Sequence, residues 1–250
     1  MKIVLVTGAT SGIGKATARR LANENCRLII CGRRTEILKS LVQELSQQTE
    51  VYPLNFDMMD YDQVSAAIDS LPREWKAIDI LINNAGNAYG LESLVEGERA
   101  DWDRMINSNV KGLLYVSRCV IPGMKERKSG HVINISSVAA LQTYPNGVVY
   151  CATKKAVKTI SEGMRLELTE FGIKVSDLAP GAVETEFSEV RFKGDKKRAA
   201  KVYTGYKALT AEDIADALSY VVNTPAHVTI AEMTIYPSAQ SSPTQIYRKS

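Results

Sequence analysis

The chain has little of the chemistry that usually builds metal and disulfide sites. Among its 250 residues there are only two histidines, His131 and His227, which lie far apart in the sequence. Metal ligands need clustered and regularly spaced side chains, so the sequence predicts no metal site. The cysteines form no CxxC pair, which is typical of a protein of the reducing cytoplasm. They are Cys26, Cys31, Cys119 and Cys151.

Long hydrophobic runs and a strong charge of one sign are also absent. The opening letters MKIVLVTGATSG turn polar after only a few apolar residues, which argues against a signal peptide and a membrane span. A net charge of +3 favours neither nucleic acid nor an anionic membrane as a partner. Hydrophobic residues at 45% and charged residues at 24% are instead typical of a folded globular protein.

Short apolar segments alternate with longer amphipathic ones along the chain. The apolar segments, which predict strands, are KIVLVT, CRLIIC, EVYPLNF, DILIN, HVINIS, KVSDLA and AEMTIY. The predicted helices cover residues 12–24, 36–47, 61–70, 98–125, 148–171 and 211–222. Nearly continuous hydrophobicity is typical of parallel strands that are covered on both faces. We therefore predict an α/β fold: a single doubly wound, Rossmann-type domain over residues 1–250, with about seven parallel strands and helices on both faces.

Two polar stretches stand apart from this alternation. Residues 188–207 are basic and interrupt the pattern after the sixth strand, so we expect either a substrate lid or a solvated surface helix. Residues 237–250, PSAQSSPTQIYRKS, are too polar to form a core by themselves. This tail is expected to be disordered or to pack on a neighbouring subunit.

Chemically distinctive residues follow six successive strands. In chain order these stretches are TGATSGIG, GRR, NFD, NNAG, SS and PGAVET. The carboxyl ends of parallel strands meet at one edge of a sheet, and ligands bind outside that edge. Turns that serve only the fold would show no such preference for one end of the strands. The pattern therefore predicts one shared site.

The first of these stretches, TGATSGIG, predicts a nucleotide-binding turn. Its glycines have no Cβ atom, so the turn can tighten and the backbone can approach a pyrophosphate. A strand before and a helix after place the turn at a helix N-terminus, where free N–H groups favour anions. The candidate cofactor-binding residues here are Gly8, Thr10, Ser11, Gly12, Ile13 and Gly14.

Two arginines indicate which dinucleotide binds. Arg33 and Arg34 follow the second strand, where NAD-binding proteins place a carboxylate on the ribose 2′-hydroxyl. A guanidinium group matches the oxygens and the charge of a 2′-phosphate, so the predicted cofactor is NADP. The alternative is a pair of solvated arginines at the start of a helix. Asp57 is a candidate to accept from the adenine amino group, and room for a ribose is left by the small residues Asn84, Ala85 and Gly86.

The stretch YCATKKA sets a tyrosine before two lysines and predicts an acid–base group. In a helix, Lys154 lies one turn after Tyr150, where its positive charge favours the phenolate. Steps of three and four residues from Lys154 meet mostly apolar side chains, whereas the same steps from Lys155 meet charged and polar ones. Lys154 is therefore expected to point into the site and Lys155 to point into solvent.

Two further polar residues are candidates to complete this group. Ser137 comes thirteen residues before Tyr150, just after the fifth strand, and is placed to bond the substrate oxygen, with Ser136 as its rival. Asn109, in the fourth predicted helix, is a candidate to hold a water between Lys154 and bulk solvent. An asparagine exposed on that helix would need no such role. Reduction of a carbonyl needs a proton donor and a polar group on the oxygen.

These residues resemble the motifs of the short-chain dehydrogenase/reductase family. TGATSGIG, NNAG, NVKG and Ser137 with YCATK occur in the family's order, and the resemblance spans nearly the whole chain. It implies a catalytic tetrad of Asn109, Ser137, Tyr150 and Lys154, with Lys154 also binding the nicotinamide ribose. It also implies a homotetramer, or a dimer, that pairs through the two long helices. By the same resemblance the nicotinamide carboxamide is held by Pro180, Gly181, Val183 and Thr185.

Within the family, the chain is similar to NADP-dependent 3-hydroxy acid dehydrogenases that oxidise serine and allo-threonine. The similarity lies in SLPREWKAIDILINNAG, GHVINISS, TEFSEVRFKGD and TPAHV, although PGAVETEFS is one residue shorter than in some relatives. It implies interconversion of a small 3-hydroxy acid, such as serine, allo-threonine or 3-hydroxyisobutyrate, and its keto acid, with Tyr150 exchanging the proton. Arg191 and Lys193 offer cations for a substrate carboxylate.

Two other functions stay open at this point. A carbonyl reductase for acyl or aromatic ketones would keep the same tetrad and differ only in its substrate. A nucleotide-sensing regulator would keep the glycine turn and could lose the proton donor. The intact set of Ser137, Tyr150 and Lys154 argues against the regulator.

Overall fold

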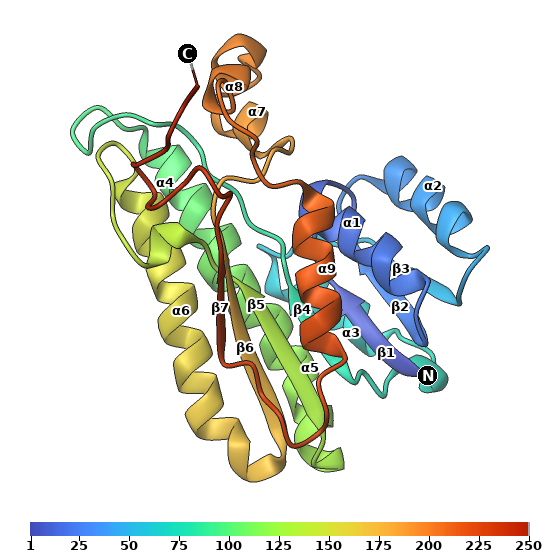
Figure 1. Cartoon of the computed structure of the whole chain (residues 1–250). Coiled ribbons are helices and arrows are strands. Elements are labelled where there is room, and N and C mark those ends of the chain that lie inside the picture. The colour runs from blue at the N-terminus through green and yellow to red at the C-terminus, as the bar shows by residue number, and fades with distance from the viewer. Residues whose placement is uncertain (250) are drawn as a thin grey trace.

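Seven parallel strands form the centre of the molecule and confirm the predicted sheet. The computed structural model describes residues 1–249 (Figure 1). The strand order is β3-β2-β1-β4-β5-β6-β7, so the chain winds outward from β1 in both directions. Every neighbouring pair is parallel, as the doubly wound α/β prediction requires. The strands are β1 (Lys2–Val6), β2 (Cys26–Cys31), β3 (Val51–Leu54), β4 (Ile80–Asn83), β5 (Gly130–Ile135), β6 (Ile173–Pro180) and β7 (Glu232–Ile235).

Helices cover both faces of this sheet (Figure 1). Helices α1, α2 and α9 pack on one face, and α3, α5 and α6 pack on the other. Along β1, Val4 and Val6 belong to the first core and Ile3 and Leu5 to the second, which explains why the strands are continuous apolar runs. The α-helices are α1 (Gly12–Ala22), α2 (Thr35–Leu45), α3 (Tyr61–Asp69), α4 (Arg99–Ile106), α5 (Gly112–Arg127), α6 (Val148–Leu168), α7 (Phe187–Arg191), α8 (Lys196–Val202) and α9 (Ala211–Val222).

The single helix predicted over residues 98–125 is wrong, because a π-helical turn interrupts it. Helix α4 ends at Ile106, and the turn Asn107–Lys111 precedes α5. Asn109 lies inside this turn, and only 2% of its surface is exposed. A π-helical turn contains about one residue more than an α-helical turn, and the spacing of apolar residues does not reveal this difference. The spacing therefore predicts one continuous helix over residues 98–125. Such π turns occur frequently at functional sites.

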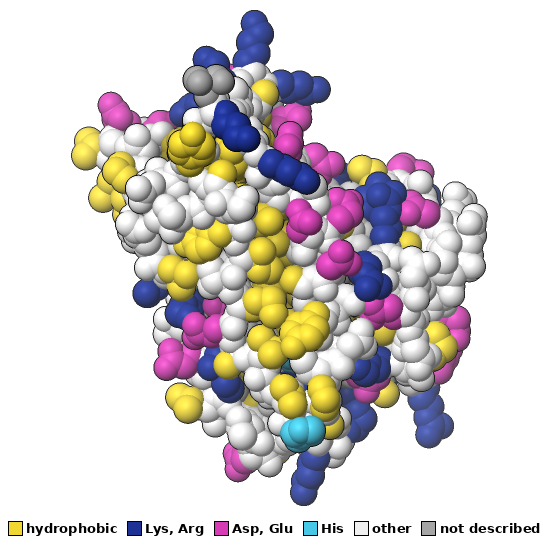
Figure 2. All heavy atoms as spheres, in the orientation of Figure 1, with side chains coloured by type: hydrophobic (Ala, Val, Ile, Leu, Met, Phe, Trp, Pro, Cys, Tyr) yellow, Lys and Arg dark blue, Asp and Glu magenta, His cyan; other side chains and the backbone are white. Residues whose placement is uncertain are grey.

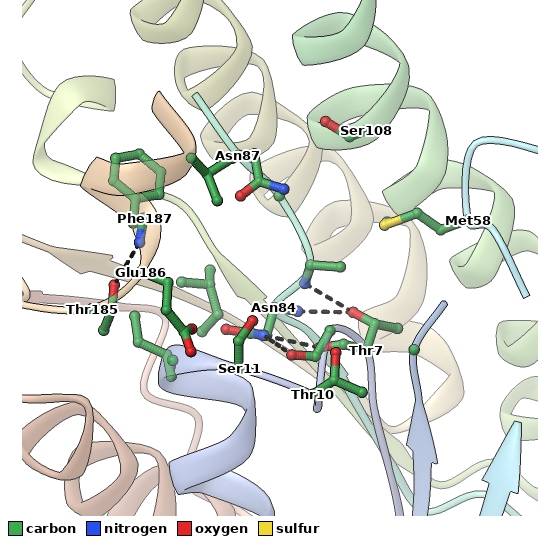
Figure 3. A pocket seen from close by; sticks show the side chains of 18 of the residues that line it. Thr7, Thr10, Ser11, Met58, Asn84, Asn87, Ser108, Thr185, Glu186 and Phe187 are labelled. Carbon is green, nitrogen blue, oxygen red and sulfur yellow. Dashed lines mark hydrogen bonds between the residues drawn. The ribbon is translucent and has the colours of Figure 1, made fainter. Parts of the chain in front are cut away.

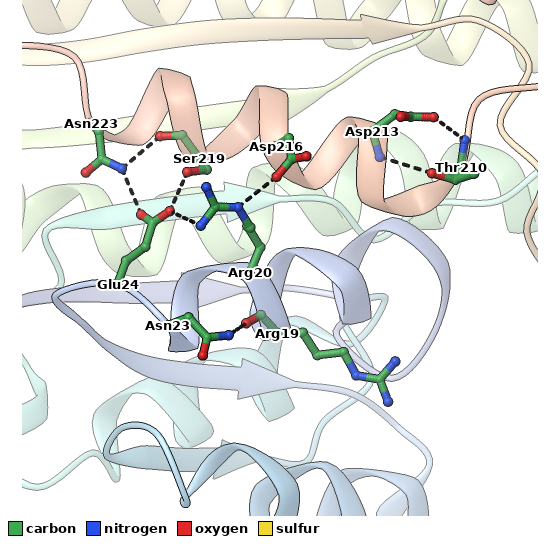
Figure 4. Close-up of polar contacts among 9 residues, drawn as sticks. All are labelled: Arg19, Arg20, Asn23, Glu24, Thr210, Asp213, Asp216, Ser219 and Asn223. Atoms are coloured by element: carbon green, nitrogen blue, oxygen red, sulfur yellow. Dashed lines mark hydrogen bonds and ion pairs between the residues drawn. The ribbon is translucent and has the colours of Figure 1, made fainter.

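A polar network ties α1 to α9 on their exposed sides (Figure 4). Arg20 donates to Glu24 and to Asp216, each at 2.7 Å. Glu24 also accepts from Asn223 at 2.7 Å and from the hydroxyl of Ser219. Both helices share one apolar core beneath this network. Because α1 begins at the glycine turn, these contacts help to fix the position of the turn.

The predicted insertion forms the short helices α7 and α8, which project beyond the sheet (Figure 1). We call residues 187–202 the α7–α8 segment. The segment contacts the chain between β4 and α4: the Arg191 carbonyl accepts from the backbone N–H of Gly90 at 2.9 Å. It is therefore neither core nor an isolated solvated helix.

The C-terminal tail is ordered and folds back on its own chain, which corrects the expectation of disorder; packing on a neighbouring subunit stays a prediction. Gln240 is buried, and its Oε1 accepts from the backbone N–H of Ala182 at 2.8 Å. Further along, the N–H of Lys249 donates to the carbonyl of Gly205 at 2.7 Å. Backbone groups in these loops need partners, and the polar tail provides them.

Within the residues that the structure describes, neither a membrane-spanning helix nor a metal-binding cluster is found. No helix within residues 1–249 combines the length and apolar character needed to cross a membrane. Over the same residues, no group of three or more His, Cys, Asp and Glu side chains is placed to hold a metal ion.

A buried histidine makes the fold sensitive to acid. His131 on β5 is 3% exposed, and its Nε2 lies 2.8 Å from the hydroxyl oxygen of Ser176. Burial, and then the charges of Lys174 and Lys2, lower the pKa of His131 from 6.5 to about 3. Between these two pKa values the unfolded chain binds one more proton than the folded chain at this residue, so stability falls as the pH falls.

We expect His131→Gln to weaken the acid dependence of stability. Between about pH 6 and pH 4, the wild type should lose about 1.4 kcal/mol per pH unit more than the variant. Urea unfolding at a series of pH values measures this difference. His227, which is exposed, provides the control: His227→Gln should leave the wild-type slope unchanged. Equal slopes for His131→Gln and the wild type would contradict the assignment.

Candidate active site

A cleft of about 720 Å³ lies at the carboxyl edge of the sheet, within the range of small-molecule sites. Residues that follow six different strands line it, as the sequence pattern predicts. The cleft brings together almost all the predicted cofactor-binding residues, along with Ser137, Tyr150 and Lys154. These cofactor-binding residues are Gly8, Thr10, Ser11, Gly12, Ile13, Arg33, Arg34, Asp57, Asn84, Ala85, Gly86, Pro180, Gly181, Val183 and Thr185.

Gly14 does not line the cleft but lies beneath the glycine turn. A Cβ atom there would come within 2.3 Å of the Gly8 carbonyl oxygen and 2.4 Å of the Asn84 side-chain nitrogen. Gly8 and Gly12 have φ values of +65° and +47°, which side chains rarely adopt. The turn therefore requires glycine at 8 and 12 for its conformation and at 14 for close packing.

Thr7, which the sequence analysis did not single out, joins the ends of β1 and β4 (Figure 3). Its hydroxyl accepts from the backbone N–H groups of Asn84 and Ala85 at 3.0 and 3.1 Å. The Asn84 side chain donates in return to the Thr7 carbonyl at 2.9 Å. The glycine turn and the NNAG turn are thus held against each other on the floor of the cleft.

The two arginines after β2 reach the cleft in different ways. Arg34 donates to the carbonyl of Thr10 at 3.0 Å and so supports the glycine turn. Arg33 is 56% exposed at its side chain and pairs with Asp57 at 3.2 Å. Arg33 is thus the more accessible cation, and Asp57 lies opposite it on the neighbouring strand end. Both residues line the cleft, and a guanidinium group suits the oxygens of a phosphate.

Lys154 points into the site and Lys155 is exposed, so helical phase predicted both positions correctly. The Lys154 ammonium donates to the carbonyl of Ile135, at the end of β5, at 2.9 Å. Burial lowers the pKa of Lys154 from 10.5 to about 8, while the charge of Asp177 on β6 acts in the opposite direction. Lys154 is therefore mostly charged at neutral pH, and the buried Asp177 is its counter-charge.

Tyr150 shows a different electrostatic environment from the expected one. Burial raises its pKa most, and Tyr144 adds to this; contact with the Ser137 hydroxyl and the charge of Arg191 lower it. Lys154, which lines the same cleft, donates to the Ile135 carbonyl, and its effect on the pKa of the tyrosine stays a prediction. The guanidinium carbon of Arg191 lies 5.6 Å from the centre of the Tyr150 ring.

Asn109 lies behind these residues and does not line the cleft. Its side-chain oxygen accepts from the N–H of Asn87 at 2.8 Å, and its nitrogen donates to the Asn87 carbonyl at 2.8 Å and to Thr153 at 3.0 Å. A Cβ atom on Gly86 would lie 2.9 Å from this oxygen and 3.5 Å from the Lys154 ammonium. Asn109 therefore fixes the wall beside Lys154.

The two predicted substrate cations have different positions. Lys193 lies outside the cleft, because its ammonium pairs with Asp101 at 2.9 Å and with Glu98 at 3.0 Å. The expectation that it binds a substrate carboxylate is therefore not supported. Arg191 does not line the cleft either, but lies beside Tyr150 in a small neighbouring cavity, and its Nη2 atom is buried with no hydrogen-bond partner among residues 1–249. A donor without a partner is suited to an incoming anion.

Two aromatic residues near Tyr150 were not among the residues predicted from the sequence. The Phe187 ring lies 5.7 Å from the Tyr150 ring and lines the cleft, and Tyr144 accepts from Arg191 at 3.1 Å. Neither follows a strand, so the rule that located the other residues could not find them. Their aromatic character within polar stretches, TYPNG and ETEFS, was the available signal.

Sheet, glycine turn and tyrosine–lysine pair together define a class of protein. A model of the short chain dehydrogenase family matches residues 2–196. The chain belongs to the short-chain dehydrogenase family, which confirms the resemblance found in its motifs.

Individual relatives cover almost the whole chain. NADP-dependent 3-hydroxy acid dehydrogenase YdfG of Salmonella typhi is 45% identical over 240 residues, which span 96% of each chain. Sulfoacetaldehyde reductase 2 of Chromohalobacter salexigens is 40% identical over 240 residues, which span 96% of this chain and 95% of the relative. A solved structure, the closed form of serine dehydrogenase complexed with NADP+, is 42% identical, covers 99% of this chain and 100% of that one, and has a TM-score of 0.94.

We expect Gly14→Ala to lower the free energy of unfolding by about 1–3 kcal/mol, because the methyl group would overlap the Gly8 carbonyl. The same change should weaken NADP binding, since the turn must move. Thermal unfolding and fluorescence titration with NADPH measure the two effects. Lys15→Ala, on the same helix, is the matched control and should change stability by less than about 0.5 kcal/mol. Unchanged stability and binding in Gly14→Ala would contradict the packing argument.

Proposed function

We propose that this protein is an NADP-dependent oxidoreductase that interconverts a small 3-hydroxy acid and its keto acid. The observation that carries the proposal is the position of Arg191, whose buried and unpartnered nitrogen lies beside Tyr150. Arg191 lines a small cavity next to the cleft, and Tyr150 lines both, so a small acid bound to Arg191 would lie beside the tyrosine. Relatives named for 3-hydroxy acids and for serine support this substrate class.

In this proposal each residue of the tetrad has one task. The cofactor, when bound, supplies the hydride acceptor or donor. Tyr150 takes the proton from the substrate hydroxyl during oxidation and returns it during reduction. Ser137 bonds the substrate oxygen, and Lys154 holds the nicotinamide ribose. Asn109 supports the proton path by fixing the wall beside Lys154.

The residues around the cleft fit the proposed cofactor. The glycine turn would hold the pyrophosphate at the start of α1, and Arg33 and Arg34 would hold the 2′-phosphate. Asp57 is proposed to meet the adenine amino group and Asn84, Ala85 and Gly86 to meet a ribose. The loop Pro180–Thr185 is proposed to hold the carboxamide, and Gln240 of the tail braces it from behind.

We expect Arg33→Ala to raise the Michaelis constant for NADP by about tenfold and to change that for NAD much less, because only NADP carries the 2′-phosphate. Arg34→Ala is the informative comparison. It should weaken both cofactors, since Arg34 also supports Thr10 in the glycine turn. Steady-state kinetics with each cofactor measure the ratio. Equal effects of Arg33→Ala on the two cofactors would refute its contact with the phosphate.

We also propose a homotetramer, with a dimer as the smaller alternative, in the reducing cytoplasm. Apolar side chains gather over the edge strand β7 and helix α9, where Tyr220 is 62% exposed (Figure 2). On the long helices, Leu166 of α6 is 80% exposed and Leu114 of α5 is 40% exposed. Exposed apolar surface of this kind is typical of subunit contacts. The four cysteines are free thiols, which fits a reducing compartment.

Turnover over a panel of substrates tests the function. We expect reduction of NADP with L-serine, allo-threonine or 3-hydroxyisobutyrate, and a loss of at least about a hundredfold in kcat in Tyr150→Phe, which lacks the acid–base hydroxyl. Two alternative substrate classes are assayed with NADPH. They are sulfoacetaldehyde, for which one relative is named, and uncharged ketones. No rate with the hydroxy acids beside fast ketone reduction would overturn the substrate, and near-normal turnover in Tyr150→Phe would overturn the mechanism.

A further inference from the structure

The small cavity beside Tyr150 is lined by more negative than positive side chains. Its volume is about 20 Å³, and the charged residues on its wall are Glu92, Glu98, Asp101 and Arg191. A space of this size holds little more than one small polar group. A substrate group that enters the cavity to reach Arg191 therefore also comes near the three carboxylates.

These carboxylates would repel an anion unless cations neutralise them, and their burial decides how strongly. The Asp101 side chain is only 6% exposed, so solvent screens its charge little. Glu92 and Glu98 are 42% and 68% exposed at their side chains, and Glu92 has Arg198 at 3.7 Å. Asp101 is therefore the group that would most oppose a carboxylate on its way to Arg191.

Lys193 neutralises Asp101 and Glu98 from outside the cavity. Its ammonium lies 2.9 Å from an Asp101 oxygen and 3.0 Å from a Glu98 oxygen. Lys193 does not itself line the cavity, so it acts through these two carboxylates. Its backbone φ is +53°, a conformation that glycine and asparagine adopt more readily than lysine. A lysine at such a position indicates a task for its side chain.

The position of Arg191 does not depend on Lys193. Its Nη1 donates to the Tyr144 hydroxyl and its Nε donates to the carbonyl of Gly90, each at 3.1 Å. Its Nη2 is buried and has no hydrogen-bond partner among residues 1–249. Lys193 therefore leaves the guanidinium group in place and changes only the charge around it.

We propose that Lys193 is a specificity-determining residue, which neutralises Asp101 and Glu98 and so allows Arg191 to bind negatively charged substrates. The proposal rests on the function proposed above and adds a charge requirement to it. Lys193 does not touch the substrate or the reacting atoms. A substrate that carries an ammonium group as well as a carboxylate brings a cation of its own, so it depends less on Lys193.

Michaelis constants for substrates of different charge test the proposal. Lys193→Gln should raise the Michaelis constant for 3-hydroxyisobutyrate about tenfold, because two carboxylates beside the bound anion lose their counter-charge. The constant for L-serine, which is a zwitterion, should rise less, and that for an uncharged ketone should stay unchanged. The kcat of each substrate should also stay unchanged, since the lysine is remote from the reacting atoms.

Variants of Asp101 test whether the lysine acts through this carboxylate. In the double variant Lys193→Gln/Asp101→Asn, the Michaelis constant for the acid should return most of the way to the wild-type value. Lys193→Arg keeps the charge and should resemble the wild type. If Lys193→Gln fails to fold because it leaves a buried carboxylate unpaired, Asp101→Asn alone still decides. It should lower the Michaelis constant for the acid about threefold, because one negative charge beside the anion is lost.

Lys196→Gln is the matched control on the same segment. Lys196 pairs with Glu189 at 3.8 Å, and neither residue lines the cavity, so all three Michaelis constants should stay at their wild-type values. A Michaelis constant for the acid that is the same in Lys193→Gln and the wild type would overturn the proposal. An equal rise for all three substrates would overturn it too, because it would show an effect on the fold and not on charge.

Inhibition by propionate separates this proposal from the proposed function. Propionate carries the carboxylate but has no hydroxyl group, so it tests anion binding without turnover of a hydroxy acid. Its inhibition constant against NADPH-dependent reduction of an uncharged ketone should rise about tenfold in Lys193→Gln. That result beside no oxidation of hydroxy acids would overturn the proposed function and support the task of Lys193. No inhibition of the wild type would overturn the present proposal.

Discussion

The junction between Thr7 and Asn84 is the interaction on which the site depends. One hydroxyl accepts two backbone N–H groups from the end of β4, and the Asn84 side chain returns a bond to the end of β1. The missing Cβ of Gly14 lets helix α1 approach this junction to within van der Waals contact. Strand ends that were free to separate could not hold the glycine turn and the NNAG turn in one geometry.

The second constraint is the burial of Tyr150 and Lys154, which opposes the ionisation of both side chains. Burial disfavours a phenolate on Tyr150 and an ammonium on Lys154, because both are charged forms. Charges from two different elements affect these pKa values. Asp177 on β6 raises the pKa of Lys154, and Arg191 on α7 lowers the pKa of Tyr150.

The parts of the structure fixed by the sheet could be predicted from the sequence, and the parts fixed by side-chain packing could not. The strands follow from apolar runs, and the helix predicted over residues 211–222 coincides with α9. Helical phase separates Lys154 from Lys155 because a long helix imposes its period on every residue. The π turn at Asn109 and the pairing of Lys193 depend on tertiary neighbours that no local pattern encodes.

The division between rigid and adaptable elements explains how one family can act on different substrates. Most residues proposed to bind the cofactor follow strands that are paired on both sides, although Asp57 follows the edge strand β3. Residues proposed to select the substrate stand on the α7–α8 segment, whose contacts include ion pairs with largely exposed partners such as Lys193 with Glu98. Exposed ion pairs contribute less than about 1 kcal/mol, so they can be changed at little cost to stability. A guanidinium group can bind a carboxylate or a sulfonate, so under the proposed function Arg191 on this segment would select the anion, while Ser137, Tyr150 and Lys154 lie after β5 and on α6.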